Sequence, residues 1–193
     1  MLGSDKLLRT ALEQDHPYVV GLDISLTSTG VYFLSLKKDD AHPDFYYHVT
    51  TNTKDGLDAT RIDNVYRIIQ DDLSNPLYPV IAACIEDYGP SGRVAGKVLV
   101  RAELCGIVKH MLRNELEIPY ILVSPNGLKK FASGKGRGDK TVTLKAAHDL
   151  GFTTKNSDEA DAFHAARLCE AYVTGQKLSV SYNRINPKSY TFS

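Results

Sequence analysis

The order of strand and helix patterns along the chain predicts an α/β fold: a mixed five-stranded sheet, three antiparallel strands followed by two parallel ones, flanked by helices. Three strand-like segments follow one another between residues 18 and 51, without a helical pattern between them. Two further apolar runs, at 80–86 and 120–123, then alternate with helical patterns. The length of 193 residues, with 42% hydrophobic and 24% charged residues, is typical of one globular domain.

Each predicted strand rests on its composition. Tyr18–Ser25, Val31–Leu36 and Phe45–Thr51 are rich in β-branched or aromatic residues and are bounded by turn-forming residues, so they predict an antiparallel meander. Val80–Glu86 is a continuous apolar run that ends in an acid, as in a strand buried on both faces. The run Tyr120–Val123 predicts the fifth strand.

The predicted helices rest on apolar spacing and on capping residues. Ser124 with Pro125 is typical of a helix start, and Gly134 of its end. Asp139 is predicted to cap a helix that runs to Leu150, and Ser157 or Asp158 is predicted to cap a helix that runs to Val173. The five helices are expected at 58–73, 92–114, 125–133, 140–150 and 158–173. This order of elements is that of the ribonuclease H-like type.

One domain, residues 18–173, is therefore expected between an N-terminal extension, 1–17, and a C-terminal tail, 174–193. The tail is basic and aromatic, and two roles for it stay open: stacking on nucleic acid, or ordinary packing. Its relevant side chains are Lys177, Tyr182, Arg184, Lys188, Tyr190 and Phe192.

Composition excludes several classes of protein. No apolar run approaches the roughly 18 residues that span a bilayer, and the first residues lack the apolar core of a signal peptide, so a cytoplasmic protein is expected. Cys84, Cys105 and Cys169 are odd in number and lie among apolar neighbours. They are predicted to be reduced core residues, without a disulfide framework or a zinc site.

Charge is unevenly distributed although the net charge is zero. Residues 91–147 contain 11 Lys or Arg and 4 Asp or Glu, a net +7, which leaves −7 for the rest of the chain. A basic middle with acidic flanks indicates a polyanion-binding face beside a group of carboxylates. Solvated helix faces are the alternative explanation.

Four acids stand at positions that the predicted fold brings together. Asp23 ends the first strand and Glu86 the fourth, and the carboxyl ends of neighbouring strands share a crevice. Asp158 and Asp161, three residues apart, share one face of the last helix, whereas Glu159 is expected to point elsewhere as a partner of the helix dipole. Converging carboxylates favour two Mg²⁺ ions and phosphodiester hydrolysis, with Mn²⁺ as a substitute.

Two further features of the sequence each fit more than one role. His164 follows Asp161 by three residues and is a candidate metal ligand or proton shuttle, or else a core histidine. The hydroxyl-rich stretch Ser25–Gly30 looks like a phosphate cradle, but its expected role is to reverse the chain between two strands.

Five motifs in order resemble the RuvC-type Holliday junction resolvases of the ribonuclease H-like superfamily, over residues 19–172. They are "GLDISLTSTGVYFL", "ACIEDYG", "GLKKF", "GKGRGDKTVT" and "SDEADAFHAA". The resemblance implies a metal-dependent endonuclease that cuts branched DNA as a homodimer without a nucleotide cofactor. It makes Asp23, Glu86, Asp158 and Asp161 the metal ligands, and the short, divergent chain resembles bacteriophage members, which act in the cytoplasm of a bacterial host.

The resemblance also implies residues that contact DNA. Lys129 and Lys140 match two lysines with DNA-backbone and catalytic roles, and Lys130 is the adjacent candidate. Tyr88 is nearest to an aromatic that acts at the junction, but it lies one position early in "EDYGPSG". The full predicted set is Tyr88, Arg93, Lys129, Lys130, Lys135, Arg137 and Lys140.

Three other functions remain as alternatives. A ribonuclease H would act on RNA–DNA hybrids, but the lysine pair argues against it. A branched-DNA-binding protein with a dead site would keep the fold, although all four acids are present here. An actin-like ATPase fragment would explain the first hairpin, but that fold needs two lobes and a second phosphate loop.

Overall fold

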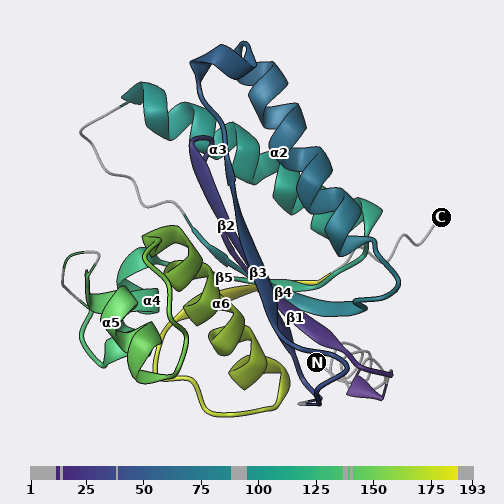
Figure 1. The fold of residues 1–193 in the computed structure, drawn as a ribbon, viewed down its shortest axis with the longest axis vertical. Coiled ribbons are helices and arrows are strands. Elements are labelled where there is room, and N and C mark those ends of the chain that lie inside the picture. The colour runs from purple at the N-terminus through teal and green to yellow at the C-terminus, as the bar shows by residue number, and fades with distance from the viewer. Residues whose placement is uncertain are drawn as a thin grey trace.

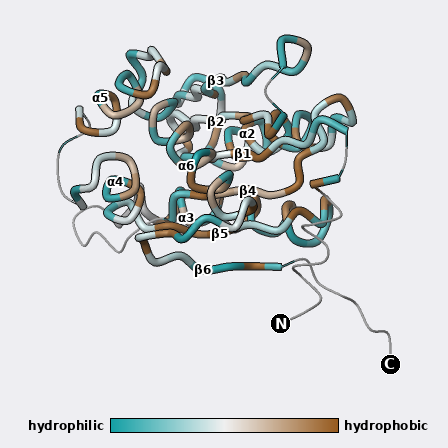
Figure 2. The backbone as a smooth tube through the Cα atoms, turned by 90° about the horizontal axis from the view of Figure 1, so that it is seen from below, coloured by the Kyte–Doolittle hydropathy of each residue, from teal (hydrophilic) through white to brown (hydrophobic). Residues whose placement is uncertain are grey.

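A six-stranded mixed sheet forms the centre of the structure, a computed structural model that describes residues 12–13, 15–37, 39–87, 95–136, 139 and 141–186. The strand order is β3-β2-β1-β4-β5-β6, which Figure 2 shows from one edge of the sheet to the other. The strands are β1 (Tyr18–Asp23), β2 (Ser28–Ser35), β3 (Phe45–Thr50), β4 (Val80–Glu86), β5 (Tyr120–Val123) and β6 (Tyr182–Ile185).

The predicted meander and the two parallel strands are confirmed. Strand β2 pairs antiparallel with both β1 and β3, and β4 lies parallel to β1 and β5. The sixth strand was not predicted: β6 adds to the sheet antiparallel to β5, from within the expected C-terminal tail. Its four residues are partly or fully exposed, so they carry no apolar alternation that would reveal a strand.

Helices cover both faces of the sheet (Figure 1). Helices α2 and α3 pack on one face, and α4, α5 and α6 pack on the other. Within the described ranges, no helix is long and apolar enough to cross a membrane. The helices are η1 (Thr53–Asp55), α2 (Asp58–Leu73), α3 (Ala95–His110), the π-helical turn η2 (Met111–Glu115), α4 (Pro125–Ser133), α5 (Thr141–Asp149) and α6 (Ser157–Val173).

Local sequence signals explain most helix ends. The Ser124 hydroxyl accepts a hydrogen bond from the Gly127 amide, and Gly134 ends α4 in the left-handed region at φ 75°, as predicted. Helix α6 is capped by Asn156, one residue before the predicted cap. The predicted start of the third helix, at residues 92–94, lies outside the described residues.

Two hydrophobic cores lie on the two faces of the sheet, and β1 contributes to both. Tyr18, Val20 and Leu22 pack toward α2 and α3, while Val19 packs toward α6. Because side chains alternate along a strand, Asp23 shares the face of Val19 and points to the α6 side. The three cysteines are buried and free, so their prediction as core residues is confirmed.

Two glycines let α6 approach the sheet closely. A Cβ on Gly21 would lie 2.0 Å from the Ala162 carbonyl oxygen and 2.3 Å from the Ala166 nitrogen. A Cβ on Gly30 would lie 2.1 Å from the Asp158 carbonyl oxygen. No side chain fits between these backbones, so the glycines set the distance between α6 and the strands β1 and β2.

Substitution of Gly21 therefore tests this contact. Gly21→Ala places a methyl group against the α6 backbone, and we expect a loss of unfolding free energy of roughly 1–3 kcal/mol, the usual cost of overpacking. Gly106→Ala in α3 is the matched control, because its Cβ would meet nothing within 4 Å. Gly106→Ala is expected to raise the free energy of unfolding by about 0.5–1 kcal/mol. Equal effects of the two variants in urea unfolding would contradict the close approach.

Candidate active site

Asp23 and Glu86 end neighbouring parallel strands at the same edge of the sheet. Leu22 pairs with Ile85, so the two acids that follow lie side by side. Each acid is only 8% exposed. The two acids therefore lie together at the carboxyl ends of β1 and β4, with both carboxyl groups largely removed from water.

Helix α6 brings further acids to this edge. Gly30 pairs with Asp23, and the Asp158 backbone packs directly over Gly30. Asp161 follows one helical turn later on the same helix face and lies close enough to Glu86 to shift its pKa. We call Asp23, Glu86, Asp158 and Asp161 the carboxylate edge.

The pKa of Glu86 is strongly raised at this edge. Burial, followed by the nearby charges of Asp23 and Asp161, raises its pKa from 4.5 to about 8, against a smaller opposing effect of Arg101 and Lys129. Such repulsion between buried acids is offset when a cation binds among them. The donor set consists of carboxylate oxygens, which suits Mg²⁺ or Mn²⁺.

Arg101 of α3 supplies positive charge to the carboxylate edge, a role that sequence reasoning missed. Its Nη2 lies 3.1 Å from Asp23 Oδ1, to which it donates a hydrogen bond, and 3.8 Å from Glu86 Oε1. In the sequence, Arg101 is one of the 11 Lys or Arg residues between positions 91 and 147. A single Arg within a helix carries no sequence signal that would link it to acids 78 and 15 residues away.

Among the predicted DNA-binding residues that the structure describes, Lys129 lies close enough to Glu86 for its charge to lower the pKa of that carboxyl group. Lys130 and Lys135 are exposed on and after α4. Lys140, predicted to be catalytic, and Tyr88, Arg93 and Arg137 lie outside the described residues.

Glu159 lies in the first turn of α6, as predicted, and it has side-chain partners that were not predicted. It is buried, and its Oε1 lies 2.6 Å from Nδ1 of His48 on β3, while its Oε2 accepts a hydrogen bond from the Thr154 hydroxyl. Since His48 pairs with Gly30, this contact fastens the start of α6 to the sheet beside Asp158. The position within the first turn of α6 gave no indication of a partner 111 residues earlier.

His164 belongs to the core on the α6 side rather than to the carboxylate edge. It is fully buried, and its Nε2 lies 2.9 Å from the Thr143 carbonyl oxygen. Burial lowers the pKa of His164, which favours a neutral ring that donates Nε2–H to this carbonyl. The structure thus supports the alternative of a core histidine.

The hydroxyl-rich turn after β1 closes on itself. The Thr29 hydroxyl donates to the Ser25 carbonyl oxygen at 2.6 Å and accepts from the Ser25 amide at 3.1 Å, and Thr29 is fully buried. These bonds use the Ser25 amide and the Thr29 hydroxyl, two of the donors that a phosphate cradle would offer. The geometry therefore agrees with a chain reversal that presents Asp23.

Comparison with solved structures gives the fold. RuvC of Thermus thermophilus aligns with a TM-score of 0.61 and 18% identity, over 82% of this chain and 97% of RuvC. The same protein in complex with a Holliday junction substrate aligns with a TM-score of 0.62 and 19% identity, over 83% of this chain and 97% of RuvC.

The chain has the RuvC fold. This likeness confirms the predicted ribonuclease H-like class, to which β6 adds a strand. The yeast mitochondrial Holliday junction resolvase Ydc2 aligns more distantly, with a TM-score of 0.51 and 14% identity, over 89% of this chain and 85% of Ydc2. No protein-family model and no curated protein matches the sequence.

The raised pKa of Glu86 predicts a pH-dependent cost in stability. A carboxyl group whose folded-state pKa lies above 4.5 destabilises the folded protein progressively as pH rises from about 4.5 to about 8. In EDTA, Glu86→Gln should therefore match the wild type near pH 4.5 and exceed its Tm increasingly up to pH 8. Each kcal/mol corresponds to roughly 2–4 °C for a chain of this size.

The matched control is Glu117→Gln, which removes the same charge from an exposed position. Its Tm should follow that of the wild type across this pH range. A Glu86→Gln curve parallel to the wild-type curve would show that the folded protein imposes no cost on the Glu86 carboxylate.

Proposed function

We propose that this chain is a metal-dependent endonuclease that resolves Holliday junctions or other branched DNA by hydrolysing phosphodiester bonds. The observation that carries the proposal is the meeting of Asp23, Glu86 and Asp161 at one edge of a RuvC-like sheet, where burial and the charges of Asp23 and Asp161 raise the pKa of Glu86 to about 8. The solved relatives are described as RuvC with a Holliday junction substrate and as a Holliday junction resolvase. Their fold supports the same substrate class here.

The carboxylate edge would hold two divalent metal ions, Mg²⁺ or Mn²⁺. Bound there, a pair of ions activates a water for attack and stabilises the leaving oxygen. Asp23 and Glu86 are positioned for this by strands rather than by loops, which keeps their carboxyl groups in place. Glu86 must lose its proton to act as a ligand, so binding releases a proton below about pH 8.

Arg101 and Lys129 would assist at the edge in different ways. Arg101 holds Asp23 and Glu86 near each other before metal binds, and it becomes available for a DNA phosphate when a metal replaces it. Lys129 lies on the side of the edge formed by α4 and would contact the DNA backbone, as Lys130 and Lys135 would. Lys140, Arg137, Arg93 and Tyr88 remain proposed DNA contacts.

A homodimer is part of this proposal. Symmetric cleavage of a four-way junction needs two active sites, and a two-fold dimer provides them in matching orientations. Each copy would then contribute one carboxylate edge.

The reaction is tested by incubating the protein and Mg²⁺ with labelled four-way, three-way, duplex and RNA–DNA hybrid substrates. Paired cuts in the four-way junction are expected, and Asp23→Asn or Glu86→Gln should lower the rate more than about 100-fold, since a lost ligand costs more than a lost residue behind it. Both variants should still bind the junction in EDTA, because the basic residues remain.

Asp63→Asn is the control for the loss of one negative charge, since Asp63 pairs with Arg67 on the exposed side of α2. It should cut at the wild-type rate. Cutting of hybrids alone would indicate a ribonuclease H, and binding without cutting by the wild type would indicate an inactive branched-DNA-binding protein. A Glu86→Gln variant that cleaves normally would refute the metal assignment.

The salt dependence of junction binding tests Lys129. Lys129→Ala should reduce the slope of log K against log salt by about one unit, because one phosphate contact is lost. Lys37→Ala is the matched control, since Lys37 is exposed beyond the end of β2 that pairs with Tyr18, at the opposite end of β1 from Asp23. An unchanged slope for Lys129→Ala, measured by fluorescence anisotropy in EDTA, would remove Lys129 from the phosphate contacts.

A further inference from the structure

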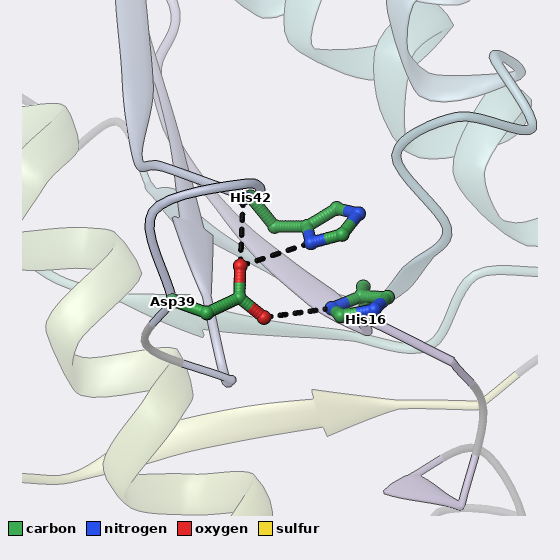
Figure 3. Close-up of side chains that lie close together, drawn as sticks. All are labelled: His16, Asp39 and His42. Atoms are coloured by element: carbon green, nitrogen blue, oxygen red, sulfur yellow. Dashed lines mark hydrogen bonds and ion pairs between the residues drawn. The ribbon is translucent and has the colours of Figure 1, made fainter.

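Two histidines and an aspartate meet at the end of the sheet opposite the carboxylate edge (Figure 3). His16 precedes β1, while Asp39 and His42 lie in the loop between β2 and β3. We call these three residues the histidine cluster. Strand β1, whose six residues span five steps of about 3.4 Å, separates it from Asp23 by roughly 17 Å. The cluster is therefore independent of the proposed nuclease chemistry.

The ligand atoms of the histidine cluster have separations that suit a small metal ion. His16 Nδ1 lies 3.2 Å from Asp39 Oδ2, and His42 Nδ1 lies 3.0 Å from Asp39 Oδ1. In a tetrahedral zinc site, with bonds of about 2.0–2.1 Å, neighbouring ligand atoms lie about 3.4 Å apart. One atom from each residue can thus reach a common ion without a large backbone movement.

The surroundings of both ring nitrogens of His16 are typical of a metal-binding histidine. Its Nδ1 is buried without a hydrogen-bond partner, although it faces the Asp39 carboxylate. Its Nε2 lies 3.2 Å from Asp15 Oδ1. A carboxylate at Nε2 keeps the proton on that nitrogen and leaves the lone pair of Nδ1 for a metal, as in carboxylate–histidine–zinc arrangements.

The backbone around the histidine cluster is anchored. The Leu36 amide donates to the Pro17 carbonyl oxygen at 3.0 Å, the Tyr18 hydroxyl to the Pro43 carbonyl oxygen at 3.3 Å, and the Ser35 amide to Asp44 Oδ1 at 2.9 Å. These bonds tie the two ends of the β2–β3 loop to each other, to Pro17 before β1 and to Tyr18 at the start of β1. The ligands therefore start from a partly organised arrangement, which lowers the entropic cost of binding.

The two imidazole rings are stacked, with centroids 3.3 Å apart and planes 16° apart. A metal binds an imidazole along the nitrogen lone pair, which lies in the ring plane. Nearly parallel rings cannot both point their lone pairs at one ion, so binding must rotate one ring about its Cβ–Cγ bond. Metal binding is thus expected to break the stack and to leave a signature in the histidine resonances.

We propose that His16, Asp39 and His42 bind a Zn²⁺ ion, with water in the fourth position. Imidazole ligands favour zinc over Mg²⁺, whereas the oxygen ligands of the carboxylate edge favour Mg²⁺, so the two sites differ in selectivity. The side chains of His16, Asp39 and His42 are 26%, 41% and 30% exposed, which leaves access for the ion and the water. The bound ion links the segment before β1 to the β2–β3 loop.

The test is a zinc titration of the metal-stripped full chain in excess Mg²⁺, followed by calorimetry and by long-range ¹H–¹⁵N spectra of the histidine rings. One Zn²⁺ should bind, shift the Nδ1 resonances of His16 and His42, and raise the Tm through mass action. His16→Ala and His42→Ala should each weaken binding more than about 100-fold, and Asp15→Asn about 10–100-fold, the usual effect of a residue behind a ligand.

Two controls make the outcome decisive. His110→Ala removes an exposed histidine that has a carboxylate but no second histidine beside it, and it should bind zinc as the wild type does. Glu86→Gln should also keep the zinc, because the carboxylate edge is not the site. A wild type that binds no zinc, a His42→Ala variant that binds it normally, or loss of zinc in Glu86→Gln would each overturn the proposal. No DNA is used, so failure of the nuclease proposal would not affect this result.

Discussion

The close contact between α6 and the first two strands is the constraint on which the rest of the candidate site depends. Gly21 and Gly30 leave no space for a side chain, so the backbones of Ala162 and Asp158 lie directly on β1 and β2. The small, buried alanines of α6 continue the same contact along the helix. A longer distance would move Asp161 away from Glu86, whose pKa its charge now raises.

This geometry has an electrostatic cost. Packing Asp23, Glu86 and Asp161 together in a region of low exposure raises the pKa of Glu86 well above that of a free glutamate. Arg101 and Lys129 reduce the repulsion but do not cancel it. A site held in place by its hydrophobic cores, yet unfavourable for its own charges, is suited to bind divalent cations and lowers the stability of the metal-free fold.

A second set of contacts holds the start of α6. Glu159 bridges His48 on β3 and Thr154 in the preceding loop. Neighbouring residues of α6 thus contact the sheet in different ways: the Asp158 backbone lies over Gly30, and the Glu159 side chain binds His48. Together with the two glycines, this bridge fixes both the distance and the rotation of α6.

The sequence by itself determined the fold class, the first five strands, most helix ends and the places of Asp23 and Glu86 at strand ends, because these depend on local patterns: apolar runs, caps, and acids that end strands. Only the tertiary structure decided the partners of Arg101, the bridge from Glu159 to His48, the interior position of His164, the edge strand β6 and the meeting of His16 with Asp39 and His42. Each of these joins residues distant in the chain, or has too few apolar residues to show a period. Sequence spacing does not encode such contacts; they arise when the two hydrophobic cores bring the elements together.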